Sequence, residues 1–215
     1  MMQISYISNA NLERTFRLDP EFYQPKYLNN ERLLSTLKNT KLITDVATIS
    51  DGNHMAIAEY FDLEGIPYYR GQDITDFFLE NNQPNYIPKD IYNKPIMRRS
   101  HFAPGDVLVS IVGTIGNLSV VPPEMQEATG SCKIAILRPK NIDANYLAMF
   151  LMSKYGNEQI KRHVRGAVQT GLILEDFSQI YVLKASDNFQ ASIKKCVDKS
   201  SEYNRESRSS YRNAE

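Results

Sequence analysis

The stretch PGDVLVSIVGTIGNLSVVPP, residues 104–123, decides the fold. Its opening Pro-Gly-Asp is a turn that leads into an unbroken apolar run over residues 107–112. Such a short run, bounded by turn residues, is typical of a buried strand. Residues 113–116 (GTIG) form a second turn, and residues 117–121 return as a strand that two prolines end. The stretch therefore predicts a β-hairpin at the centre of a folded domain.

The pattern on either side of this hairpin is mixed. Short segments rich in β-branched and aromatic residues run from residue 46 to residue 121, and further strands are predicted at 133–137 and 180–183. Helices are predicted at 26–38, at 144–153 behind the N-cap residue Asp143, and at about 157–164, with a short helical turn at 174–177. We therefore expect an α+β fold, a mixed and mainly β domain with flanking helices.

The last part of the chain differs in character, since residues 188–215 contain neither Pro nor Gly. Phe189, Ile193, Cys196 and Tyr203 follow the 4-3 spacing of a coiled coil, although Ser200 and Ser207 weaken the seam. We predict a long C-terminal coiled-coil-type helix with these four residues as its helix interface. The chain then divides into a domain over 1–184, with an N-terminal arm and helix at about 15–40, and a spacer or dimerisation helix over 185–215. This helix either continues in a longer protein or pairs with another copy.

Composition narrows the class of protein. The chain has 215 residues, no apolar run long enough to cross a bilayer, and a formal net charge of zero. Its two cysteines are far apart in sequence, which fits a reducing cytoplasm and predicts a cytoplasmic protein. The charges are segregated: residues 51–87 hold seven acids and one base, whereas residues 132–170 hold seven bases and two acids. This segregation allows one positive face, although a solvated surface of mixed sign is the alternative.

A search for reactive groups indicates a non-catalytic chain. There is no glycine-rich phosphate loop, His54, His101 and His163 stand apart in sequence, and neither cysteine has a close partner. Asp73 and Asp76 have no nearby lysine of the kind that a metal-dependent nuclease site uses. We predict no catalytic residue, no metal site and no cofactor in this chain.

Five segments together resemble the specificity (S) subunit of Type I restriction–modification enzymes. They are RLDPEFYQPKY (17–27), IPYYRGQDI (66–74), PGDVLVS with GTIG (104–116), NYL with FL (145–151) and GAVQTGL (166–172). They occur in the order of that family and at its rough spacing, over about residues 15–183. A long helix also follows the recognition domain in the family, as it does here.

The resemblance implies a target recognition domain that reads one half of a bipartite double-stranded DNA target. It implies partners as well: methyltransferase (M) subunits that bind S-adenosylmethionine, and a restriction (R) subunit in the full complex. Family members usually have two recognition domains, so one domain here implies a homodimer or a second recognition domain joined through the C-terminal helix. Two alternatives stay open, a helix-mediated assembly module without DNA reading and the recognition end of a single-chain restriction–methylation enzyme.

Loops that carry Arg, Lys, Asn or Gln are the candidates for DNA contact. Phosphates are bound by cations and amides, and base edges by bidentate groups. Arg70 could instead form an ion pair with Asp73 or Asp76. Arg98 and Arg99 could instead be ordinary solvated charges. The predicted DNA-binding residues are Arg70, Gln72, Arg98, Arg99, His101, Asn117, Lys133, Arg165, Gln169 and Thr170.

Overall fold

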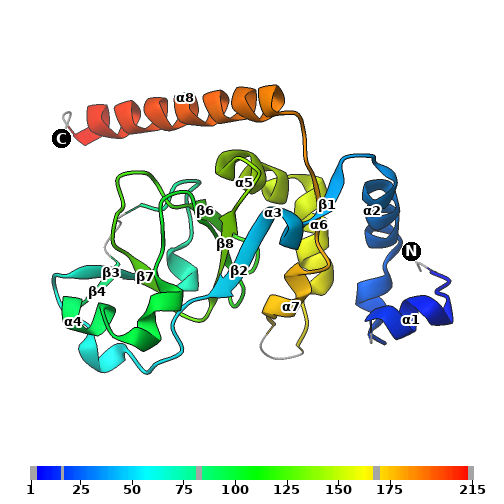
Figure 1. The fold of residues 1–215 in the computed structure, drawn as a ribbon, viewed down its shortest axis with the longest axis horizontal. Helices are drawn as coiled ribbons and strands as arrows, with labels where there is room; N and C mark the ends of the chain where they lie inside the picture. The colour runs from blue at the N-terminus through cyan, green and yellow to red at the C-terminus, as the bar shows by residue number, and fades with distance from the viewer. Residues whose placement is uncertain (1–3, 16, 81–83, 167–169, 213–215) are drawn as a thin grey trace.

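The computed structural model describes residues 4–15, 17–80, 84–166 and 170–212. The structure confirms a mixed fold of helices and strands that a long C-terminal helix follows (Figure 1). Within the described residues, no helix is both long enough and apolar enough to span a membrane.

A four-stranded antiparallel sheet forms the centre of the domain. Its order is β2 (Ala47–Asp51), β8 (Ile134–Pro139), β5 (Val107–Ser110) and β6 (Leu118–Val120). The predicted hairpin is confirmed, since Val107 pairs with Val120 and Val109 with Leu118. The first strand is shorter than predicted and ends at Ser110. Ile111 and Val112 leave the hairpin because they bond to other segments, at Lys133 and Gly171.

Two smaller sheets flank this centre. One has the order β4 (Asn85–Ile87), β3 (Ile66–Tyr69) and β7 (Thr129–Gly130), and the other joins β1 (Thr40–Leu42) to β9 (Tyr181–Leu183). Short helices fill the connections between strands. They are α3 (Ile43–Val46), η2 (Ala58–Tyr60), η3 (Gly71–Asp73), α4 (Lys89–Tyr92), η4 (Pro95–Ser100) and α7 (Leu174–Phe177).

The larger helices of the domain are α2 (Pro25–Thr36), α5 (Ala144–Met152) and α6 (Lys154–His163). Asp143 caps α5 as predicted, because its Oδ1 accepts the backbone N–H of Tyr146 at 3.0 Å. Helix α6 begins earlier than predicted, because Ser153 ends α5 and caps α6 at the same point. The two helices therefore follow each other without a connecting loop.

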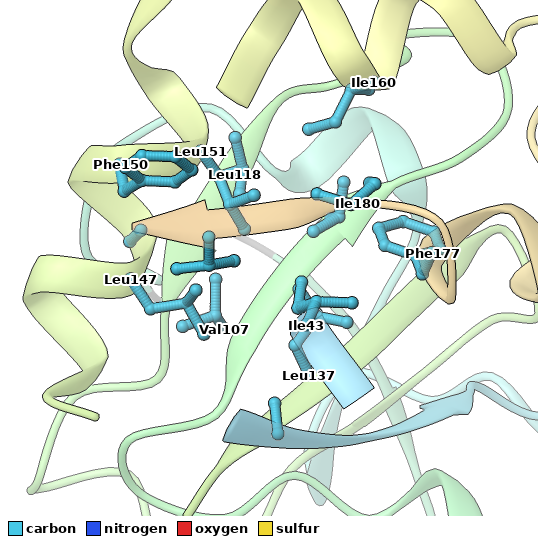
Figure 2. Close-up of a cluster of buried hydrophobic side chains, with 14 of the residues drawn as sticks. Ile43, Val107, Leu118, Leu137, Leu147, Phe150, Leu151, Ile160, Phe177 and Ile180 are labelled. Atoms are coloured by element: carbon cyan, nitrogen blue, oxygen red, sulfur yellow. The ribbon is translucent and has the colours of Figure 1, made fainter. Parts of the chain in front are cut away.

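The main core lies between the central sheet and these helices. Figure 2 shows side chains from several elements meeting there, among them Val107 of β5, Leu137 of β8, Leu147 of α5 and Phe177 of α7. All four are fully buried. Burial of these aliphatic and aromatic groups is the main stabilising contribution to the fold, and it holds the sheet and the helices in one body.

The N-terminal arm, which holds α1 (Asn9–Thr15) and η1 (Pro20–Tyr23), is tied to α6 through one aromatic ring. The buried ring of Phe22 packs against the guanidinium groups of Arg17 and Arg162, which lie 4.7 and 4.1 Å from the ring centroid. The hydrogen bond from Arg17 lowers the pKa of Asp19. Arg17 also approaches the carbonyl oxygens of His163 and Val164, at 3.4 and 3.5 Å. The arm thus braces the chain just before the 165–172 segment.

The C-terminal helix α8 (Asp187–Arg212) runs along one side of the domain, opposite the side where α7 lies (Figure 1). Gln190 fixes its start, because its amide bonds to the backbone of Asp143 and Ala185. Near its end, Arg208 pairs with Asp76 and Glu80. The helix is therefore anchored to its own domain at both ends.

The predicted interface residues of α8 differ in their exposure. Phe189 and Tyr203 are more than half exposed, and Cys196 is exposed as well. Ile193 instead packs partly against the main core of the domain. Three of the four residues thus keep surface that is accessible to a partner helix, whereas Ile193 helps to hold α8 on the domain, as does the edge contact of Phe189 with Tyr146 at 6.2 Å between ring centroids. The domain boundary at residue 184 stays a prediction.

Candidate nucleic-acid interface

Several loops meet at one end of the central sheet, where β5 ends at Ser110 and β8 begins at Ile134. We call it the Ser110 end and define it by residues 51–54, 70–73, 98–99, 111–117, 131–133, 165–166, 170–172 and 176. Backbone hydrogen bonds join the loops: Ile111 N–H donates to Lys133 O at 2.9 Å, and Gly52 N–H donates to Ile134 O at 3.1 Å. The loops are therefore parts of one surface and are not independent projections.

Arg165, Gly171 and Leu172 join this surface through two sets of bonds. Arg165 and Gly171 exchange backbone hydrogen bonds at 3.0 and 2.9 Å, and Leu172 N–H donates to Ile111 O at 2.9 Å. Arg165 and the exposed Thr170 are thus brought to the Ser110 end. The predicted site residue Gln169 lies outside the described residues.

Arg70 reaches the same place on a turn that leaves little room for a side chain at Gly71. A Cβ on Gly71 would lie 2.8 Å from Ser110 Oγ and 3.3 Å from Val112 O, so a larger residue would require the Ser110 side chain and the Val112 carbonyl to shift. Arg70 Nε and Nη2 each lie 3.2 Å from a carboxylate oxygen of Asp73. This confirms the ion pair of Arg70 with Asp73. Asp76 instead pairs with Arg208. The neighbouring Gln72 is exposed and carries no such bond among the described residues.

A second cluster joins β2 to η4 at the Ser110 end. The carboxylate of Asp51 is largely buried, and it pairs with Arg99 through one oxygen and with His54 through the other. The side chains of Arg99 and His54 are 59% and 62% exposed, so both can also meet an external ligand. Sequence reasoning missed His54, although its position three residues after Asp51 was a usable signal. Arg98, next to Arg99, is exposed.

Arg165 is held by the most deeply buried acid of this surface. Its guanidinium pairs with Asp176, whose side chain is 3% exposed. Burial raises the pKa of Asp176, but the close approach of His163 Nδ1, at 3.4 Å, and a hydrogen bond from Ile173 N–H outweigh it and leave the pKa below its usual value. Asp176 is therefore a fixed negative charge at neutral pH.

The remaining predicted residues differ in their placement. Lys133 is exposed at the Ser110 end and has no ion pair among the described residues. Asn117 is exposed, and its amide donates to Ile74 O at 3.0 Å, which leaves its oxygen accessible. His101 is not brought together with them, since its ring stacks on Tyr92 at 3.7 Å and its Nε2 lies 2.9 Å from Tyr92 O. His101 therefore has a packing role in this structure.

The arrangement offers recognition chemistry. Arg70, Arg99, Lys133 and Arg165 supply charged donors on one surface, with polar neighbours from Asn117 and Thr170. Over the described ranges, no group of three His, Cys, Asp or Glu side chains is placed to hold a metal ion. Such a surface can bind phosphates and the polar edges of bases through hydrogen bonds.

Comparisons with known proteins agree on the fold. No protein-family model matches the sequence, and no curated protein matches it. Among solved structures, a chain from a type I R-M system, in a structure that describes complex assembly and conformational transition, is 16% identical with a TM-score of 0.58. That match covers 89% of this chain and 47% of the other.

Two further structures bear the same likeness. The HsdS subunit from Thermoanaerobacter tengcongensis is 17% identical with a TM-score of 0.54, over 81% of this chain and 42% of that subunit. The type IIG restriction endonuclease BpuSI is 10% identical with a TM-score of 0.61, over 89% of this chain and 30% of the enzyme. This chain spans less than half the length of each of these proteins. It shares the fold of type I restriction–modification S subunits over that part.

Proposed function

We propose that this chain reads the sequence of double-stranded DNA as the recognition domain of a Type I restriction–modification specificity subunit, or as a half-subunit of one. The observation that carries the proposal is the convergence of Arg70, Arg99, Lys133 and Arg165 on the Ser110 end. The fold shared with the HsdS subunit is an independent line of support.

The cations of the Ser110 end suit two kinds of DNA contact. Lys133, which is exposed and has no carboxylate partner within the described residues, suits a phosphate because an ammonium group acts as a point charge. The half-exposed arginines suit guanine, because a guanidinium can donate two parallel hydrogen bonds to O6 and N7 in the major groove. Rigid strands hold both kinds of residue on loops, as groove recognition requires.

Helix α8 suits the assembly part of the proposal. Phe189, Cys196 and Tyr203 are exposed along a helix that stands on one side of the domain, away from α7 (Figure 1). We propose that this helix sets the spacing to a second recognition domain, in a homodimer or in a longer chain, and docks the M subunits. Those subunits would bind S-adenosylmethionine, and an R subunit would join for cleavage.

Methylation mapping is the decisive experiment. We expect a bipartite methylated motif in cells that carry this chain with its partner M subunit, and we expect its loss when the chain is removed. Binding of the chain to randomised duplexes, measured by fluorescence anisotropy at low salt, tests DNA reading directly. Lys133→Ala should weaken this binding, whereas Lys195→Ala, on the exposed side of α8, should not. Absence of duplex binding would favour the assembly module without DNA reading.

A second candidate function rests on one observation. The chain matches part of BpuSI, a type IIG restriction endonuclease, with a TM-score of 0.61. This likeness favours the recognition end of a single-chain restriction–methylation enzyme. Discovery of a methyltransferase region in the same polypeptide would favour it over a separate subunit.

A further inference from the structure

Three arginines of the Ser110 end share one construction. Each guanidinium is about half exposed, and each is paired with a carboxylate that is largely buried. The pairs, with the exposed fraction of the arginine side chain given first, are Arg70–Asp73 (42% and 19%), Arg99–Asp51 (59% and 10%) and Arg165–Asp176 (39% and 3%).

Two of the three carboxylates accept a backbone N–H, and the third belongs to a residue that the sheet holds in place. Asp73 accepts the N–H of Arg70 at 2.8 Å, and Asp176 accepts the N–H of Ile173 at 3.1 Å. Asp51 is the last residue of β2, where it lies opposite Ala135 of β8. Each acid is therefore a rigid anchor, and the arginine is the movable partner of the pair.

A guanidinium has five N–H groups in a planar fork, and a carboxylate occupies only part of them. An arginine anchored in this way keeps free donors for a ligand and loses less conformational entropy when the ligand binds. The carboxylate also offsets its charge, which weakens attraction to phosphates of any sequence. Both effects increase the difference between the affinity for the correct DNA sequence and the affinity for all other sequences.

We propose that Asp51, Asp73 and Asp176 are specificity-determining positioning residues, each of which holds its arginine in the orientation that reads a guanine edge. The inference rests on the proposed function and adds to it the chemistry of the contacted base. It treats the acids as part of the reading surface and not as competitors of DNA for the arginines.

A fourth pair of the same construction serves as a matched control. Arg138 donates from Nε and Nη2 to Asp106, both at 2.8 Å, and the two side chains are 52% and 1% exposed. Arg138 lies near the far end of β8 and Asp106 lies just before β5, away from Ser110 and Ile134. This pair therefore has the build of the other three but lies at the other end of the sheet.

The test compares Asp73→Asn with Asp106→Asn in the full chain. Each protein is mixed with a pool of duplexes that have a randomised centre, and the bound duplexes are sequenced. An asparagine at 73 can still accept the Arg70 N–H, so the turn is retained while the charge is lost. We expect the preference for one G·C pair to fall by about 5- to 150-fold, because a good bidentate base contact is worth that much. Affinity for duplexes without the motif should rise.

Asp106→Asn should leave the selected motif unchanged, whatever it does to the melting temperature. Arg70→Lys is the second variant: it keeps the charge without the planar fork, so it should lose the same base preference while it keeps its affinity for duplexes without the motif. An unchanged motif in Asp73→Asn would overturn the inference, as would equal weakening at every position. If the unmodified chain selects no motif at all, the proposed function itself fails, and the inference fails with it.

Discussion

Replacement of Lys133 by alanine tests the reading surface most directly. If its ammonium group contacts one phosphate of B-DNA, the slope of log affinity against log salt becomes shallower by about 0.9. The structure also predicts the slope for the unmodified chain. Arg70, Arg99 and Arg165 are each paired with an aspartate, namely Asp73, Asp51 and Asp176, so they should add little to it. Of the five cations in this region, Arg98 and Lys133 alone have no ion pair among the described residues. We therefore expect a slope near −2 for the unmodified chain, whereas five phosphate contacts would give about −4.5.

The assay is fluorescence anisotropy with one labelled duplex between about 50 and 200 mM salt, the range over which such slopes are measured. Over this fourfold change, a slope difference of about 0.9 alters the ratio of the two affinities by about 3.5-fold. Lys195→Ala, an equal loss of charge on the exposed side of α8, is the control and should give the unmodified slope. If Lys133→Ala and the unmodified chain give the same slope of log affinity against log salt, Lys133 does not contact a phosphate. A slope near −4.5 would show that the carboxylates do not screen the arginines.

The other predictions concern stability and assembly. Leu147→Ala, at a fully buried core position, should lower the free energy of unfolding by about 2–5 kcal/mol in urea denaturation, whereas the half-exposed Leu33→Ala should cost far less. Folding lowers the pKa of Asp176, so its carboxylate adds to the free energy of unfolding. This stabilisation is fully present above the unfolded-state pKa of about 4, and it is lost as the pH falls through the lower pKa of the folded state. Asp176→Asn should therefore destabilise the protein at pH 7, and the difference from the unmodified chain should shrink as the pH falls below about 4. Phe189→Ser, on the exposed face of α8, should reduce self-association in analytical ultracentrifugation without a change in duplex affinity per protomer.

Local patterns in the sequence were enough for the elements that depend on near neighbours. The hairpin over residues 104–123 was predictable because Pro and Gly bound an apolar run whose two halves pair with each other. Asp143 was predictable as a cap because its partner, Tyr146, lies only three residues away. The long C-terminal helix followed from the lack of Pro and Gly after residue 187.

Contacts between distant parts of the chain could not be predicted in the same way. Arg99 and Asp51 are 48 residues apart, and the pairing of β2 with β8 sets the place of Asp51. His54 differs from Arg99 in this respect, because it lies only three residues from Asp51 and its contact with the same carboxylate was within reach of the sequence. The face of α8 that packs on the domain depends on Gln190 and on the position of α5, which no heptad pattern encodes.

The neutral net charge of the chain is compatible with DNA reading when the pairing of its charges is considered. A protein that must find one sequence among many competitors gains from a low affinity for all other sequences, because biological selectivity depends on the ratio of the two. Unpaired cations raise both affinities together, since phosphates are the same in every sequence. Arg70, Arg99 and Arg165, each offset by an aspartate, add little to general attraction and keep free donors for base edges. On the proposed function, a net charge of zero is therefore compatible with a surface that discriminates through anchored arginines and has few free cations, such as Lys133, to hold the duplex.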